Sequence, residues 1–222
     1  MRVYHFLSKE HGLQALEKQR LKVARINELN DPFELLAAEL SDRADRQRFL
    51  KWKDETSCRI GFLCFSRRII NPLLWSHYAD RHRGVALELE VDDQLAVPVQ
   101  YRRSRMKLDI QRIKSSGGFS EKLAEQLGST KSRHWLYEEE VRVAIDLQDC
   151  QSEGNLLFEP MRNGLKIVSI TAGPLCELDS SEIRCRLAKG NEITLYYARI
   201  AFRSFDVVLN RAKRSQMIRA IG

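Results

Sequence analysis

The stretch from Trp135 to Leu147 constrains the fold most, because it combines the period of a strand with three charged side chains. Its apolar positions alternate along the sequence, as in a half-buried β-strand: Val141, Val143, Ile145 and Leu147. If the strand extends back to Trp135, its opposite face carries Glu138, Glu140 and Arg142, spaced about 6.5–7 Å apart. Such a row predicts either the wall of a polar cleft or a cross-strand ion-pair ladder.

Strand-like and helix-like segments are mixed along the 222 residues without strict alternation, which favours an α+β fold. Strands are expected over residues 3–7, 21–25, 60–65, 85–91, 97–101 and 135–147, within 155–170, and over 193–202 and 205–209. Helices are expected over 9–19, 32–40 and 42–53, from 72 up to Gly84, within 104–129, and over 180–187. The predicted architecture is a mixed, largely antiparallel sheet with flanking helices.

Local signals place several of the helix ends. Ser41 is an expected N-cap, and Asn30-Asp31-Pro32 and Asn71-Pro72 each place a proline in the first turn of a helix. Gly84 is expected to close the helix that begins at Pro72, and Gly117-Gly118 to interrupt the polar segment in the middle of the chain.

The chain has no internal repeat, low-complexity tract or Pro/Gly-rich linker, so we expect one domain over residues 1–222. Residues 1–150 carry the motifs described below, and residues 151–222 are expected to complete the sheet and to supply a basic C-terminal segment. No apolar run approaches the roughly 20 residues of a membrane span, and the first residues lack the apolar region of a secretory signal. We therefore expect a cytoplasmic protein with no membrane partner.

Cysteine usage and charge narrow the function classes further. The five cysteines are odd in number and form no C-x-x-C pair, so neither a disulfide framework nor a metal site is expected. Two segments account for much of the net charge of +7: residues 101–122 have seven basic side chains against two acidic ones, and residues 199–222 have six against one. Such segments either attract RNA or DNA or serve as solvated surfaces.

Four motif clusters stand out along the chain. They are Tyr4-His5-Phe6, residues 29–34 (LNDPFE), Cys64-Phe65-Ser66 with residues 75–80 (WSHYAD), and residues 135–142 (WLYEEEVR). In content and order these clusters resemble an uncharacterised bacterial family, classed as a domain of unknown function, over about residues 4–142. The resemblance continues more loosely through Gly173-Pro174, and it implies no particular reaction.

A histidine on the first predicted strand, a serine and aromatic residues near a middle strand, and a late E-x-E also resemble the layout of ADP-ribosyltransferases. This resemblance implies that type of fold and NAD as the substrate. It implies that His5 binds the ribose and amide side of NAD, and that Tyr78 or Trp75 stacks on the nicotinamide. It also implies that Glu140 stabilises an oxocarbenium-like transition state, while Glu138 orients the acceptor.

Ser66, Asn30, Asp31 and Arg142 complete the NAD-binding set that we expect. Two positions depart from the transferase pattern: Phe65-Ser66-Arg67 replaces an S-T-S triplet, and Asn30-Asp31 has no obvious counterpart. Structural alternatives stay open as well, since Asn30-Asp31 also fits a helix-initiating turn and His5 and Trp75 also fit core positions.

The sequence therefore favours an NAD-dependent ADP-ribosyltransferase, or an NAD glycohydrolase, acting on a nucleic acid or protein acceptor. A toxin or phage-defence setting, with an antitoxin or defence partner, is the expected context. One alternative is a metal-free nuclease or nucleic-acid-binding effector that acts without NAD. Another is a non-catalytic interaction module in which the glutamates form an ion-pair ladder.

Overall fold

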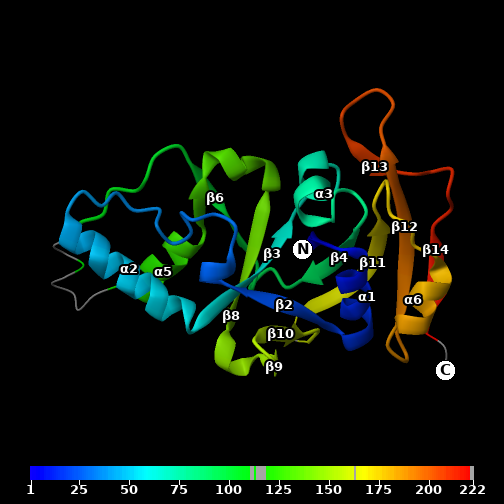
Figure 1. Ribbon diagram of the computed structural model, residues 1–222, viewed down its shortest axis with the longest axis horizontal. Coiled ribbons are helices and arrows are strands. Elements are labelled where there is room, and N and C mark those ends of the chain that lie inside the picture. Colours follow the sequence, from blue (N-terminus) through cyan, green and yellow to red (C-terminus); the bar gives the residue numbers. More distant parts are fainter. Residues whose placement is uncertain (111–112, 114–118, 163, 221–222) are drawn as a thin grey trace.

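The computed structural model of the protein describes residues 1–110, 113, 119–162 and 164–220, which form an elongated α+β molecule built on a branched sheet (Figure 1). The strands are β1 Arg2–Leu7, β2 Arg20–Arg25, β3 Ile60–Ser66, β4 Val85–Val91, β5 Val97–Pro98, β6 Gln100–Arg102, β7 Thr130–Ser132, β8 Glu140–Asp146, β9 Gln151–Glu153, β10 Leu156–Pro160, β11 Leu165–Ala172, β12 Glu192–Ile200, β13 Val207–Leu209 and β14 Gln216–Arg219. The α-helices are α1 Lys9–Lys18, α2 Arg43–Ser57, α3 Pro72–Tyr78, α5 Glu121–Gly128 and α6 Ser180–Arg186. Three 3-10 helices lie between them: η1 Ile26–Glu28, η2 Arg133–Glu138 and η3 Leu147–Asp149.

The sheet branches at β3. Strand β8 pairs with β3 along one edge, from Ile60 opposite Asp146 to Ser66 opposite Glu140. The other edge of β3 is shared, since β2 pairs with its beginning and β1 meets its end at a single register pair, Tyr4 with Ser66. Strand β1 pairs instead with β4 along its whole length. Strands β1 and β3 therefore diverge from the point where they meet.

Later strands extend the sheet on both sides of this branch. On one side, β11 pairs with β4, β12 pairs with β11, and β13 and β14 both pair with β12. On the other side, β10 pairs with β2 and β9 pairs with β10. Among the described residues, the pairs β11–β12 and β6–β7 are parallel and the other strand pairs are antiparallel.

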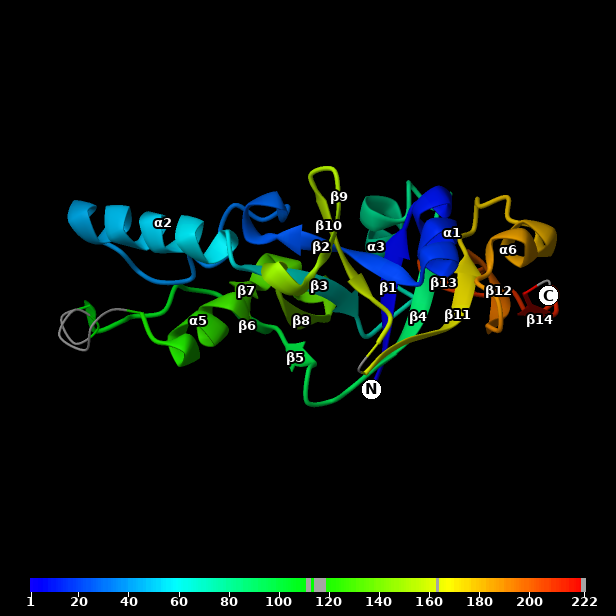
Figure 2. The same cartoon turned by 90° about the horizontal axis from the view of Figure 1, so that it is seen from below.

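Helices cover the sheet in three places, and each place has its own apolar cluster. Figure 2 shows α2 and α5 at one end of the molecule and α6 with β12–β14 at the other. Leu13 and Leu16 of α1 and Ile183 of α6 pack on the largest cluster, which includes β4 and β11. Trp75 of α3 lies in a second cluster with Phe6, and α2 and α5 enclose a third. None of the described helices is long and apolar enough to cross a membrane.

The structure confirms the α+β class and the mixed, largely antiparallel sheet. Asn71 caps α3 as expected, because its side chain accepts a hydrogen bond from the backbone N–H of Leu73 at 3.0 Å. The cap of α2 is Asp42, one residue beyond the predicted Ser41, and this helix continues to Ser57. The single strand expected over 97–101 is instead two strands, β5 and β6, and β14 was not predicted.

Two larger predictions are wrong. The helix expected over 32–40 does not form: residues 32–35 make a turn, which ends at Leu35 because this residue has a left-handed φ of 58°. The strand expected back to Trp135 begins only at Glu140, since η2 precedes it and Glu139 has a φ of 43°. In the middle segment, α5 spans Glu121–Gly128, and the predicted break at Gly117-Gly118 lies outside the described residues.

Gly84→Ala is expected to lower the free energy of unfolding by about 3 kcal/mol or more, because a Cβ here would lie 2.1 Å from the backbone oxygen of Leu7. That clash would force β1 away from the turn after α3. Gly154→Ala is a control with open space around it, and its φ of 61° should cost only about 1 kcal/mol. Urea unfolding followed by circular dichroism measures both, and equal losses would contradict the tight contact at Gly84.

Candidate functional site

A cavity of about 260 Å³ lies where β1 and β3 diverge. It is lined by Tyr4, His5 and Phe6 of β1, Cys64, Phe65 and Ser66 of β3, Leu74 and Tyr78 of α3, Glu28, Leu29 and Asn30 at and after η1, and Lys131, Glu138 and Glu140. The cavity thus brings together most of the predicted site residues, namely His5, Asn30, Ser66, Tyr78, Glu138 and Glu140.

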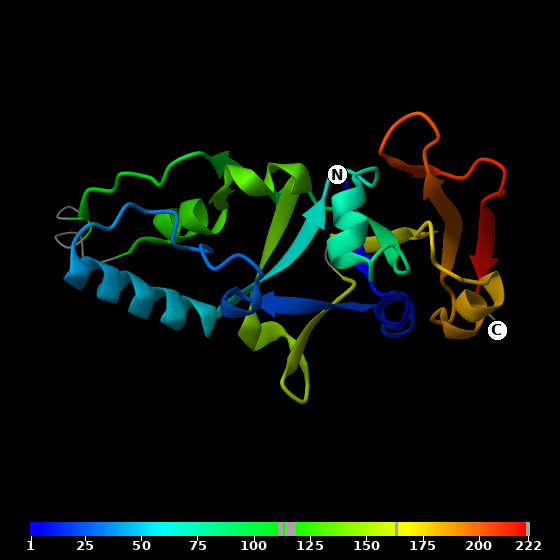
Figure 3. The ribbon, with the colours of Figure 1, turned by 45° about the horizontal axis from the view of Figure 1, so that its top comes forward.

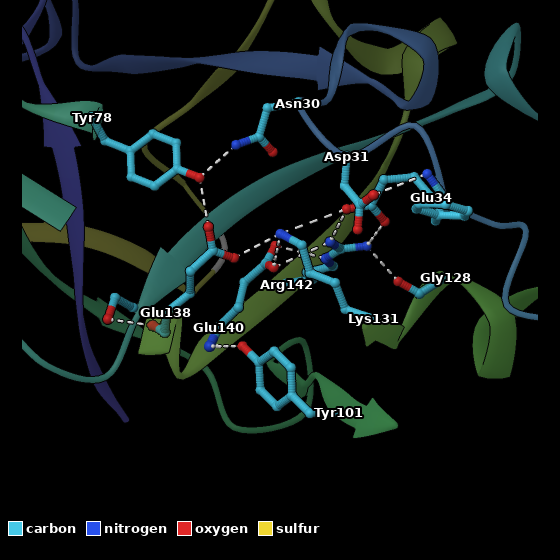
Figure 4. A network of polar contacts seen from close by, with 12 residues as sticks. Asn30, Asp31, Glu34, Tyr78, Tyr101, Gly128, Lys131, Glu138, Glu140 and Arg142 are labelled. Carbon is cyan, nitrogen blue, oxygen red and sulfur yellow. Dashed lines mark hydrogen bonds and ion pairs between the residues drawn. The ribbon is translucent and has the colours of Figure 1, made fainter. Parts of the chain in front are cut away.

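Lys131, on β7, lies at the centre of a buried polar network (Figure 4). Its ammonium donates to Glu138 at 2.6 Å and to Glu140 at 3.0 Å, and lies 3.7 Å from Glu34. The same nitrogen is 4.8 Å from the centre of the Trp135 ring, which covers it. One lysine therefore holds two glutamates that come from different elements.

Arg142 supports the network from β8, next to Glu140. Its guanidinium binds both carboxylate oxygens of Glu34 at 2.7 Å and both oxygens of Glu140 at 2.7 and 3.1 Å. A fifth hydrogen bond, of 2.7 Å, goes to the backbone oxygen of Gly128. All five N–H donors of Arg142 are used, so this side chain positions the carboxylates and does not line the cavity.

The turn between η2 and β8 brings the two glutamates of E-x-E together. Glu138 ends η2, the left-handed Glu139 reverses the backbone, and Glu140 starts β8. The Ser66 hydroxyl donates to the backbone oxygen of Glu138 at 2.6 Å and accepts from the backbone N–H of Arg68. Ser66 therefore holds the Glu138 backbone in place. The two carboxylates meet at Lys131, not in a straight row along one strand.

The environments of Glu138 and Glu140 shift their pKa values in opposite directions. Burial raises the pKa of Glu138, and the neighbouring Lys131 ammonium offsets only part of this effect. Burial acts in the same direction on Glu140, but Arg142 and Lys131 outweigh it and hold the pKa of that carboxyl below its ordinary value. Glu140 is thus a fixed anion, while Glu138 takes up a proton more readily.

The hydroxyl of Tyr78 connects Glu138, through hydrogen bonds, to Asn30 in the segment after η1. Tyr78 donates to the Glu138 carboxylate at 2.5 Å and accepts a hydrogen bond from the side-chain amide of Asn30 at 2.6 Å. Burial, together with the Glu138 charge, raises the pKa of Tyr78, so its hydroxyl keeps its proton. Tyr101 acts at Glu140, where its hydroxyl accepts from the backbone N–H at 2.8 Å.

His5 lies on β1 at the divergence of the strands. Its Nδ1 is 2.9 Å from the backbone oxygen of Cys64, which can only accept, so Nδ1 donates and the neutral ring presents Nε2 as an acceptor. Burial lowers the pKa of His5, which favours this neutral form. The ring also packs edge-on against Phe65, with 5.5 Å between the ring centres.

Two other predicted residues do not line the cavity. Trp75 is fully buried in the cluster beneath α3, and its indole N–H donates to the backbone oxygen of Ile69 at 2.6 Å. Asp31 is buried as well, and its carboxylate accepts from the backbone N–H of Phe33 at 2.9 Å. Asp31 therefore stabilises the turn that places Glu34 next to Arg142.

Sequence reasoning missed Glu34 and Lys131. Glu34 is the last residue of the LNDPFE motif, in which the sequence pointed only to Asn30 and Asp31, as NAD-binding residues or as a helix-initiating turn. Lys131 lies in the polar segment before WLYEEEVR, where neighbouring basic residues gave it no distinguishing pattern. Both side chains are charged and buried, so each needs a partner of opposite charge. Glutamate and lysine usually lie on the surface, and the neighbouring residues in the sequence do not show that these two are buried.

The arrangement is suited to stabilising positive charge. The cluster holds three carboxylates, Glu34, Glu138 and Glu140, against the two cations Lys131 and Arg142, which leaves one negative charge in excess. Among the described residues, no group of three or more His, Cys, Asp or Glu side chains is placed to hold a metal ion.

A family model described as "Protein of unknown function (DUF2971)" matches residues 74–143. The match runs from α3 into β8 and includes the WSHYAD and WLYEEEVR motifs, which confirms the resemblance to an uncharacterised family. No curated protein and no solved structure matches the chain. The resemblance to ADP-ribosyltransferases therefore stays a prediction.

Arg142→Met is expected to lower the free energy of unfolding by about 3–5 kcal/mol, because it leaves Glu34 and Glu140 buried without their main partner. Arg68→Met is the matched control, since Arg68 forms an ion pair with Glu139 at the surface and should lose only about 0–1 kcal/mol. Urea unfolding measures the two losses. A loss at Arg142 as small as that at Arg68 would contradict the supporting role of Arg142.

Glu138→Gln and Glu140→Gln are expected to change the pH dependence of stability in opposite directions. A raised pKa means that the folded protein keeps a proton that the unfolded chain has released. The contribution of Glu138 to stability therefore falls as pH rises from the unfolded value of about 4.3 through the folded pKa. A lowered pKa reverses the sign, so the contribution of Glu140 is lost as pH falls from about 4.3 through its folded pKa.

Urea unfolding at steps from about pH 3 to about pH 8 tests this pair of variants. Relative to the wild type, Glu138→Gln should gain stability as the pH rises, and Glu140→Gln should lose it. If both variants change in the same direction, the two carboxyls do not differ as described.

Proposed function

We propose that this protein is an NAD-dependent ADP-ribosyltransferase or NAD glycohydrolase, and that the cavity between β1 and β3 cleaves the bond between ribose and nicotinamide. The observation that carries the proposal is the convergence of His5, Tyr78 and the Glu138–Glu140 pair on one cavity. These side chains come from the first strand, from α3 and from the η2–β8 turn, and they follow the chain order of the transferase layout, although Glu138 precedes the late strand and does not lie on it. On this proposal, the branched sheet is an ADP-ribosyltransferase-like fold.

The charge of the site suits this reaction. As the C1′–N bond breaks, its electron pair leaves with the nicotinamide, which becomes neutral, and positive charge develops on the ribose. A carboxylate fixed beside that charge lowers the barrier without reorganisation. Glu140 fits this role, because Arg142 and Lys131 keep it ionised at neutral pH.

The other cavity residues then have distinct roles. The unprotonated Nε2 of His5 is available to accept a hydrogen bond from a ribose hydroxyl. Tyr78 offers an aromatic surface in the cavity wall, in place of the buried Trp75. Glu138, whose pKa is raised, suits the removal of a proton from the incoming acceptor or water. The acceptor oxygen or nitrogen then bonds to C1′ as its proton leaves.

The size of the cavity limits what it holds. Its volume of about 260 Å³ is slightly below the range of about 300–1,000 Å³ that is common for drug-sized ligands. We therefore infer that it takes the nicotinamide and its ribose, while the rest of the dinucleotide lies outside.

Glu140→Gln is expected to lower the rate of nicotinamide release from NAD by about 10²–10³-fold, because it removes the fixed charge from the transition state. Glu139→Gln is the control: Glu139 is the neighbouring carboxylate, it pairs with Arg68 outside the cavity, and its loss should leave the rate unchanged. The assay follows nicotinamide release and the transfer of label from the adenosine part of NAD to a mixture of RNA, DNA and protein.

The products decide between the possible reactions. Label on a macromolecule identifies a transferase, and release without transfer identifies a glycohydrolase. If there is no release and no saturable binding of NAD, the proposal fails, and a nuclease or nucleic-acid-binding effector becomes the better explanation. An unchanged rate in Glu140→Gln would remove Glu140 from the mechanism.

A further inference from the structure

The loop between β12 and β13, residues 201–206, places two large aromatic side chains in solvent. Phe202 is 86% exposed and Phe205 is 99% exposed, and Ile200 just before the loop is 65% exposed. Figures 1 and 3 show this loop, in orange, projecting from the molecule beside α3. Two phenylalanines that are exposed to this extent lower solubility and contribute little to the packing of this fold. Their exposure therefore indicates a binding surface.

Basic side chains lie close to the aromatic rings of this region. The Arg199 guanidinium lies 4.4 Å from the centre of the Phe202 ring, and the Lys213 ammonium lies 4.6 Å from the centre of the Tyr197 ring. Tyr197 and Arg199 are two residues apart on β12, so they share one face of the strand. The segment from Arg199 onward carries six basic side chains against Asp206 alone.

We propose that the β12–β13 loop and the adjoining face of β12 bind single-stranded nucleic acid. Unpaired bases stack on the exposed rings of Phe202 and Phe205, a contact that tolerates any sequence because every base has a π-face. Arg199, Arg203 and the basic residues after β13 neutralise the phosphates. A duplex keeps its bases stacked inside, so it would use only the phosphate contacts.

A lipid surface is the other partner that exposed phenylalanines could reach, and the charges argue against it. Arg199 lies over the Phe202 ring, and Asp206 directly follows Phe205. Insertion of both rings into hydrocarbon would draw a guanidinium and a carboxylate toward it, which is costly. Stacked bases and phosphates instead offer both the apolar and the anionic contacts that this loop needs.

The loop is anchored next to the candidate site. The backbone N–H of Val207 donates to the backbone oxygen of Ile70 at 2.9 Å, and Ile70 lies between Ser66 and the start of α3. A strand bound to the loop would therefore pass close to α3, which carries Tyr78. The inference itself does not rest on the chemistry proposed for the cavity, since it follows from the loop alone.

Fluorescence anisotropy of a labelled single-stranded RNA and a single-stranded DNA of about 20 nucleotides, with the 222-residue chain, tests the proposal. The double substitution Phe202→Ala/Phe205→Ala should weaken binding about tenfold or more, and Phe202→Trp/Phe205→Trp should retain it. Leu156→Ala, which removes an exposed apolar side chain of β10 outside both basic segments, is the control and should bind like the wild type.

The outcomes separate the surface from the cavity chemistry. Binding of single strands that is lost with the alanine pair and kept with the tryptophan pair supports the proposal, whether or not NAD is cleaved. Equal binding by the wild type and the alanine pair overturns it, as does the absence of saturable binding. Phenylalanine-dependent binding to vesicles with anionic lipid, without such binding to nucleic acid, would also overturn it and identify a membrane surface.

Discussion

The buried pair between Arg142 and Glu34 joins three segments that are far apart in the sequence. Glu34 comes from the turn after η1, Arg142 from β8, and the Gly128 oxygen that Arg142 also binds ends α5. Burial of a guanidinium is costly unless each of its donors finds an acceptor, and here all five do. The position of Glu140, and through Lys131 that of Glu138, follows from this arrangement.

The cavity depends on a second constraint, which is the competition of β1 and β2 for one edge of β3. Because each strand pairs with only part of that edge, β1 leaves β3 after the Tyr4–Ser66 pair. Backbone groups exposed by such a divergence need other partners, and the His5 side chain supplies one by donating to the Cys64 oxygen. The same histidine thus stabilises the branch and faces the cavity that the branch creates.

Local sequence signals predicted the elements but not the way in which they combine. A continuous apolar run located β3, alternating apolar residues located β4 and the apolar part of β8, and Asn71-Pro72 located the start of α3. The pattern failed where a left-handed residue changed the backbone direction, at Leu35 and at Glu139, since neither residue type signals a positive φ. Glu34 and Lys131 became recognisable only through their buried partners, which lie in other segments.

These same backbone reversals give the glutamates different properties. On one continuous strand, Glu138 and Glu140 would share a face and an environment. The turn at Glu139 instead sets Glu140 against both Arg142 and Lys131, while Glu138 meets Lys131 and the neutral Tyr78. Two adjacent carboxyls thereby acquire pKa shifts of opposite sign, which provides a permanent anion and a proton acceptor in one cavity. The proposed cleavage through a cationic sugar would use this division of roles, since one group would keep its charge while the other accepts a proton.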